Sequence, residues 1–151
     1  TPERRTPMNT VRQLLDTKTR PSLVTIAPDR STYEALQLMA RHDIGAVLVL
    51  AQGRLAGILT EREYARRIVL EGRTSRHTPV HDTMCANFPH ITPETDLEEC
   101  MGLMTDRRVR YLPVMEEERL VGLISIGDVV KSLLEQQRAN IDHLERYITG
   151  V

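Results

Sequence analysis

The chain is poor in aromatic residues and in cysteine. Its 151 residues contain no Trp, one Phe and four Tyr, and aromatic residues make up 3% of the composition. A platform that stacks the bases of single-stranded nucleic acid needs several rings, so this composition argues against one. The two cysteines, Cys85 and Cys100, are too few for a small secreted fold held by disulfides and lack metal-ligand spacing. We therefore expect a reducing, cytoplasmic location, with Cys100 as part of a core.

Long apolar runs and an excess of charge of one sign are also absent. No run approaches the roughly 20 residues that span a bilayer, and the first ten residues, TPERRTPMNT, show no signal-peptide pattern. The formal net charge of -1 provides no general attraction for nucleic acid or for an anionic membrane. The 5 histidines are scattered without ligand spacing. The sequence thus predicts no nucleic-acid, membrane or metal partner, and any phosphate binding must be local.

What the sequence does contain is an internal repeat. The stretch GILTEREYA, residues 57–65, matches GLISIGDVV, residues 122–130, at an offset of 65 positions. At the same offset Met39 matches Met104 without any gap. Self-similarity at one fixed period indicates a duplicated structural unit.

Each copy predicts the same order of elements: strand, helix, strand, strand, helix. The first helix is expected to begin at Ser31-x-x-Glu34 in one copy and at Thr95-x-x-Glu98 in the other, both of capping-box form. The run AVLVL at residues 46–50 lacks polar alternation, as expected for a strand covered on both faces. One such unit has too small a core to fold alone. We therefore predict an α+β fold of two β-α-β-β-α repeats packed pseudo-symmetrically.

Composition also sets the expected boundaries. The predicted segments are a first repeat at 8–72, a polar linker at 73–78, a second repeat at 79–135 and a C-terminal helix at 136–149. Similar segments at 10–15 and 79–84 are expected to be lead-in helices, each for the repeat that it precedes.

The C-terminal helix carries an apolar face of its own. Ile141, Leu144 and Ile148 follow one another at spacings of three and four residues, which places them on one side of a helix. This face either packs on its own module or forms a dimer contact.

The duplicated motif has two interpretations. Ser125 and Asp128, like Thr60 and Glu63, fit a helix cap, in which the hydroxyl and the acid satisfy free backbone N–H groups. A strand-to-helix junction also attracts anions, and an ionised carboxylate accepts hydrogen bonds from both hydroxyls of a ribose. The second interpretation describes a nucleotide-binding site, with Gly127 allowing close approach of a ligand.

On these motifs the chain resembles a tandem pair of CBS domains, a Bateman module, of the small stand-alone bacterial type. The resemblance runs from about Pro7 to Ile148 and rests on the doubled unit, on RVRYLPV at 108–114, on GLISIGD at 122–128 and on GILTEREYARRIV at 57–69. It implies a non-catalytic regulatory module that binds an adenine nucleotide (AMP, ADP, ATP or a dinucleotide of the NAD(P)(H) type) between its repeats. It also implies a homodimer that regulates an enzyme or transporter in trans and requires no cofactor.

The resemblance further implies two nucleotide sites of unequal strength. In the main site Asp128 would hold the ribose, and Ser125, Arg110 and Arg62 would contact phosphate. The residues expected to frame the adenine of the main site are Thr25, Ile26, Ile44, Gly45 and Ala46. The residues expected to line the second site are Thr60, Glu63, Ile91, Thr92, Val109 and Tyr111.

The second site departs from the family pattern. Glu63 stands in place of the usual Asp, and Gly45 occupies the position that Arg110 has in the other repeat. A charge-assisted phosphate contact contributes roughly 1.5–3 kcal/mol, so this site is expected to bind about tenfold more weakly or to stay empty.

Other functions remain possible on sequence alone. Arg110 and Arg62 also fit solvated surface positions. An enzyme could use Asp128 or Glu63 as a general base, although no partner for such a base is visible. A structural dimerisation scaffold with degenerate nucleotide sites is the main alternative to a nucleotide sensor.

Overall fold

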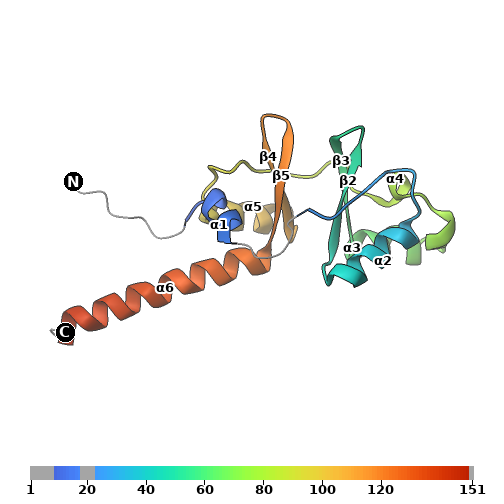
Figure 1. Cartoon of the computed structure of the whole chain (residues 1–151). Helices are drawn as coiled ribbons and strands as arrows, with labels where there is room; N and C mark the ends of the chain where they lie inside the picture. Colours follow the sequence, from blue (N-terminus) through green and yellow to red (C-terminus); the bar gives the residue numbers. More distant parts are fainter. Residues whose placement is uncertain (1–8, 18–22, 150–151) are drawn as a thin grey trace.

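The computed structural model describes residues 9–17 and 23–149 as two similar α+β units beside each other, followed by a long helix (Figure 1). The first repeat contains β1 (Thr25–Ile26), α2 (Thr32–His42), β2 (Ala46–Ala51), β3 (Arg54–Thr60), α3 (Glu61–Tyr64) and the π-helical segment η1 (Ala65–Val69). The second repeat contains α5 (Leu97–Arg107), β4 (Tyr111–Glu116), β5 (Arg119–Ser125) and α6 (Ile126–Thr149). Three short helical elements lie outside this pattern: α1 (Val11–Thr17), the 3-10 turn η2 (Ser75–His77) and α4 (Val80–Thr83). The predicted α+β class and the doubled unit are confirmed.

The two sheets differ by one strand. In the first repeat β1 pairs parallel to β2, and β2 pairs antiparallel to β3. The second repeat has only β4 and β5, because the first strand expected in each copy is reduced here to a parallel bridge between Ile91 and Val114. Pro89 and Pro93 flank this bridge, and proline has no N–H to donate to a ladder.

Both hairpins turn through two residues of positive φ. The β2–β3 turn uses Gln52 and Gly53, with φ of 53° and 79°, and the β4–β5 turn uses Glu117 and Glu118, with φ of 50° and 66°. Turns of this kind match the right-handed twist of the strands that they join. The two repeats therefore share their hairpin geometry, although only the first has a glycine to fit it.

Each lead-in helix packs on the repeat that it does not directly precede. On sequence grounds α1 belongs to the first repeat, but it packs on the second, beside α5 (Figure 1). The backbone N–H of Val11 donates to the Thr95 carbonyl at 2.9 Å, and Val80 of α4 donates to Arg30 of the first repeat at 2.7 Å. Each lead-in helix thus ties one repeat to the other.

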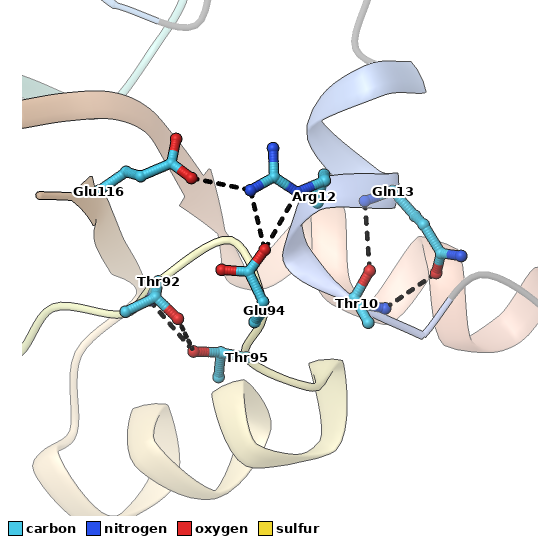
Figure 2. Close-up of polar contacts among 7 residues, drawn as sticks. All are labelled: Thr10, Arg12, Gln13, Thr92, Glu94, Thr95 and Glu116. Carbon is cyan, nitrogen blue, oxygen red and sulfur yellow. Dashed lines mark hydrogen bonds and ion pairs between the residues drawn. The ribbon is translucent and has the colours of Figure 1, made fainter.

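The same exchange explains how α5 begins. Thr95 does not cap it, because the Thr95 hydroxyl accepts from the Thr92 backbone N–H at 3.1 Å and the N-cap residue is Asp96 (Figure 2). The N–H of Leu97 instead donates to the carbonyl of Asn9, ahead of α1, at 2.7 Å. The predicted Thr95 cap is therefore wrong.

The predicted cap of α2 is confirmed. The Glu34 N–H donates to the Ser31 hydroxyl at 3.1 Å. The N–H of Thr32 donates to the Thr78 carbonyl at 2.8 Å, which is the counterpart of the bond from Leu97 to Asn9. Residues 73–78, predicted as a linker, thus also help to complete the first repeat.

Polar and apolar contacts together hold α1 in place. The Arg12 guanidinium pairs with both Glu94 and Glu116 at 2.8 Å (Figure 2), and these two carboxylates raise the Arg12 pKa. Val11 and Leu14 are 0% and 3% exposed in the core of the second repeat. Exposed ion pairs contribute little, so the apolar burial provides most of the stabilisation.

Each repeat has its own core, and a third cluster joins them. Cys100, Leu112 and Ile124 are fully buried in the second repeat, which confirms Cys100 as a core residue. Ala46, Leu48 and Ile58 form the buried centre of the cluster between the repeats. The half-buried residues packed on that centre are Leu55, Cys85, Phe88, Tyr111, Leu120 and Leu123.

The final helix is longer than predicted. The last helix of the second repeat and the C-terminal helix predicted at 136–149 form one helix: α6 runs without interruption from Ile126 to Thr149 and projects away from both repeats (Figure 1). No Gly or Pro interrupts residues 128–149, so nothing in the sequence breaks the helix. Ile141, Leu144 and Ile148 are 51%, 57% and 80% exposed, so the interpretation that they pack on their own module is wrong.

Candidate functional site

A cavity of about 500 Å³ lies between the repeats, and we refer to it as the inter-repeat cavity. Its volume falls within the roughly 300–1,000 Å³ of small-molecule sites. The first repeat contributes Gly45, Ile58 and residues 60–63, from the start of β2 and from the β3–α3 junction. The second repeat and the segment before it contribute Cys85, Asn87, Phe88, Pro89, Arg107, Val109, Arg110 and Tyr111.

The β3–α3 junction presents a helix start to the cavity. The Thr60 hydroxyl accepts from the Glu63 N–H at 3.2 Å, which caps α3. The Glu63 carboxylate does not reach back to Thr60 but pairs with Arg67 at 3.3 Å, and its side chain is 15% exposed. Arg67 also donates to the Met84 carbonyl at 3.0 Å. Glu63 is thus a largely buried carboxylate held at the edge of the cavity by a cation one turn away.

Tyr111 and Gly45 meet across the repeat boundary. A Cβ built on Gly45 would lie 2.5 Å from the Tyr111 hydroxyl and 2.6 Å from Oε1 of Glu61, so a larger residue there would have to displace these side-chain ends. Burial, and then the charge of Glu61, raise the pKa of Tyr111, while the Gly45 backbone and Arg110 act in the opposite direction. The phenol therefore stays protonated at neutral pH and keeps a donor at the cavity wall.

Three arginines surround the cavity. Arg62, Arg107 and Arg110 all line it and are all solvent-exposed. Arg62 donates to the carbonyl of Arg108, which ends α5 in a left-handed conformation, and so links α3 to the second repeat. Guanidinium groups at the opening of a partly apolar cavity suit a phosphorylated ligand.

Ser125 and Asp128 form a complete capping box at the start of α6. The Ser125 N–H donates to the Asp128 carboxylate at 2.9 Å, and the Asp128 N–H donates to the Ser125 hydroxyl at 3.1 Å. This reciprocal pair is the capping geometry that the sequence allows at this position. One carboxylate oxygen of Asp128 is therefore directed at its own helix start.

The structure divides the predicted site residues differently from the sequence. Gly45, Arg62 and Arg110, assigned on sequence to the site of Asp128, line the inter-repeat cavity with Thr60, Glu63, Val109 and Tyr111. Arg62 and Arg110 thus lie on the wall of the cavity that Thr60 and Glu63 also line, where the sequence analysis placed no phosphate-binding arginine. Arg110 immediately precedes β4 and lines the cavity with Thr60, although its backbone carbonyl also accepts from the Ile126 N–H at 2.8 Å, beside Asp128 in the first turn of α6.

Other predicted lining residues lie elsewhere. Thr25 is exposed on β1, and Ile26 is buried in the core of the first repeat, which half-buried Ile44 also contacts. Ala46 is buried in the cluster between the repeats. Ile91 belongs to the core of the second repeat, and Thr92 is exposed and bonded to Thr95. None of these six residues lines the inter-repeat cavity.

Several cavity residues were not predicted from the sequence. Ile58, Glu61 and Arg107 adjoin positions that the sequence analysis named. Cys85 and residues 87–89 reach the cavity from the segment before the Ile91 bridge. The chain's single Phe, Phe88, beside Pro89 was the available signal for this wall.

The described residues were also searched for metal sites and for membrane-spanning helices. No group of three or more His, Cys, Asp or Glu side chains that could hold a metal ion occurs among them. Of the helices in the described ranges, none is both long and apolar enough to cross a bilayer. What the cavity offers is a cationic opening, apolar walls and two carboxylates.

Comparison with known proteins gives matches over both repeats. The CBS domain family model matches residues 11–70 and 80–135. A CBS domain-containing protein of Bacillus subtilis is 32% identical over 141 residues, which cover 90% of this chain and 97% of that protein. A mitochondrial CBS domain-containing protein of Arabidopsis thaliana is 40% identical over 127 residues, 81% of this chain, and the match spans 62% of the plant protein.

Solved structures agree with the fold. A protein with CBS domains from Burkholderia ambifaria is 44% identical and superposes with a TM-score of 0.80, covering 85% of this chain and 96% of its own. A CBS-domain protein from Agrobacterium tumefaciens is 38% identical with a TM-score of 0.79, covering 87% and 98%.

Proposed function

The chain belongs to the CBS-domain family, and from that premise we propose that it is a non-catalytic regulatory module that binds an adenine nucleotide in the inter-repeat cavity. CBS domains in general are regulatory and bind nucleotides. The observation that carries the proposal for this chain is the cavity itself, in which arginines, a helix start and a held carboxylate from two repeats converge.

Each part of a nucleotide has a suitable wall. Ile58, Phe88 and Val109 offer apolar surface for a purine. The Glu63 carboxylate can accept hydrogen bonds from ribose hydroxyls, and Arg62 and Arg110 can contact phosphate. AMP, ADP, ATP and NAD(P)(H) all present these three groups. No cofactor is part of the proposal.

In this proposal Asp128 serves as a helix cap at the start of α6. Its carboxylate already accepts the Ser125 N–H at 2.9 Å, so binding a ribose through the same oxygen would cost that bond. The pseudo-equivalent site at Asp128 is then secondary, which reverses the ranking expected from the sequence.

The cellular setting is also a proposal. Cys85 and Cys100 are both free thiols, which favours a reducing compartment such as the cytoplasm. A chain without catalytic machinery of its own would act on a regulated enzyme or transporter in trans, as a homodimer.

Thermal shift with AMP, ADP, ATP, NAD(H), NADP(H), GTP and S-adenosylmethionine tests the proposal. A ligand that binds only the native state raises the midpoint in proportion to ln(1 + [L]/Kd). We expect adenine nucleotides to raise it and Arg110→Gln to weaken the tightest of them about tenfold or more, since a charge-assisted contact is lost. Arg66→Gln is the matched control, because Arg66 is exposed nearby but does not line the cavity.

Two outcomes would contradict this function. If no nucleotide shifts the midpoint, the dimerisation scaffold with degenerate sites becomes the better description, and the exposed apolar residues of α6 favour it as the second candidate. If Arg110→Gln and Arg66→Gln affect affinity equally, the cavity is not the phosphate site.

A further inference from the structure

One wall of the inter-repeat cavity, formed by Cys85 and residues 87–89, is fixed to both repeats. At its start, the N–H of Cys85 donates to the Ile58 carbonyl in β3 at 2.8 Å, and the Ile58 N–H donates back to the Cys85 carbonyl at 3.0 Å. Just beyond its end, the N–H of Ile91 donates to the Pro113 carbonyl in β4 at 3.0 Å. The middle of this wall is therefore positioned by strands of both repeats.

Asn87 lies in the middle of this wall. Its backbone carbonyl accepts from the Cys85 thiol at 3.4 Å, and its exposed side chain lines the cavity. Within residues 9–17 and 23–149, no group forms a hydrogen bond with the Asn87 side-chain amide. This amide has two N–H donors and one carbonyl acceptor. It is therefore available to a molecule that enters the cavity.

Asn87 also differs in charge from most of the polar side chains around it. The cavity is lined by three arginines and by the carboxylates of Glu61 and Glu63, which suit the phosphate and hydroxyl groups of a ligand. A purine base is neutral and presents donors and acceptors side by side on its edge. A side-chain amide matches such an edge with one donor and one acceptor, and Phe88, the next residue, lines the cavity with an apolar ring. This wall thus combines an apolar surface with a neutral hydrogen-bonding group.

We propose that Asn87 selects the base of the bound nucleotide, and that it selects adenine. This role rests on the proposed function, in which the purine lies against Ile58, Phe88 and Val109. The Asn87 side-chain carbonyl accepts from the 6-amino group of the purine, and its NH2 group donates to N7, which is the bidentate pairing of an amide with adenine. Guanine presents two acceptors, O6 and N7, on the same edge. One of the two hydrogen bonds is then lost, whichever way the amide is turned.

Isothermal titration calorimetry with ATP, 7-deaza-ATP and GTP tests this role. The three corresponding monophosphates are used instead if AMP raises the thermal midpoint more than ATP does. 7-Deaza-ATP has a C–H group in place of N7 and cannot accept from Asn87. Wild type should bind ATP about three- to tenfold more tightly than 7-deaza-ATP or GTP, since one hydrogen bond is lost with each. Asn87→Ala should bind ATP about tenfold more weakly than wild type and should bind ATP and 7-deaza-ATP alike, because both hydrogen bonds are already gone.

Two further variants separate the amide from general effects. Asn87→Asp keeps the shape of the side chain but has no N–H donor, so it should weaken ATP binding at least as much as Asn87→Ala and should also lose the N7 preference. Asn140→Ala is the matched control, because Asn140 is exposed on α6 and does not line the cavity. It should keep the wild-type affinities for all three nucleotides. Asn87 is itself exposed, so its variants should unfold at about the same temperature as wild type without ligand.

Two results would overturn the assignment of Asn87. One is a wild type that binds 7-deaza-ATP as tightly as ATP, and the other is an Asn87→Ala protein that still distinguishes the two. In either case nucleotide binding itself is retained, so the proposed function stands. A wild type that binds no nucleotide would refute the proposed function and the role of Asn87 together.

Discussion

The side chain of Leu15 on α1 packs directly on the backbone of Gly122 in β5. A Cβ on Gly122 would lie 2.8 Å from Cδ2 of Leu15. Met84, after α4, makes the same contact with Gly57 in β3, where a Cβ would lie 2.6 Å from its Sδ. The glycine that begins each copy of the duplicated motif therefore packs against a side chain from a lead-in segment. The segment before the first repeat packs on the second repeat, and the segment before the second repeat packs on the first.

This relationship predicts the order of three glycine substitutions. Gly57→Ala should destabilise by about 1–3 kcal/mol, because its Cβ also meets the rigid Cys85 carbonyl at 2.9 Å. Gly122→Ala should cost less, since the flexible end of Leu15 can move. Gly102→Ala is the control: it lies in α5 with nothing within 4 Å and should stabilise by about 0.5–1 kcal/mol. Urea denaturation measures all three, and equal losses at Gly57 and Gly102 would refute the packing role.

The second hairpin should be easy to stabilise. Glu118 has a φ of 66° at the position where the first repeat has Gly53. A side chain in the left-handed region costs about 1 kcal/mol relative to glycine, so Glu118→Gly should raise the free energy of unfolding by about that amount. Gly53→Ala, at a φ of 79° in open space, should lower it by a similar amount. A Glu118→Gly protein no more stable than wild type would count against this strain.

The two carboxylates of the duplicated motif should respond differently to neutralisation. Glu63→Gln removes a charged acceptor from the inter-repeat cavity and should weaken adenine-nucleotide binding by about 1–2 kcal/mol, roughly tenfold in Kd. Asp128→Asn should leave the affinity nearly unchanged, because Asn caps a helix about as well as Asp. Calorimetry on both folded variants decides between the sites, and the reverse result would return the ribose to Asp128.

The Cys100 thiol should make stability fall at high pH. Burial raises its pKa from 9.0 to about 11, because the folded core disfavours the thiolate. Above pH 9 the unfolded chain loses this proton and the folded chain keeps it, so unfolding is increasingly favoured until about pH 11. The full difference corresponds to about 2–3 kcal/mol.

The measurement is the free energy of unfolding at several pH values for wild type and Cys100→Ala. The variant should be less stable near neutral pH, because it leaves a small cavity, and the gap should narrow between pH 9 and 11. In the native protein at neutral pH, a thiol reagent should modify the half-buried Cys85 well before Cys100. A constant gap across this pH range would show that the Cys100 thiol ionises alike in both states.

The sequence by itself determined the local structure and the repeat. Apolar continuity in residues 46–50 placed β2, Ser31 placed the start of α2, and the offset of 65 placed the second unit. These features depend on residues close together in the chain, so the spacing of those residues is enough to predict them. The turn at Gln52-Gly53 belongs to the same class, since a glycine marks its left-handed backbone.

Only the tertiary structure decided how the repeats combine. The lead-in segments at 10–15 and 79–84 are similar, so nothing local says which one covers Gly57 and which covers Gly122. The two motif sites are likewise alike in sequence. What separates them is the placement of distant groups: Arg110 and Tyr111 approach Thr60 from the other repeat, whereas Asp128 folds back on Ser125. Long-range packing sets these positions, because two equivalent local motifs leave several global arrangements open and the burial of side chains between repeats selects one.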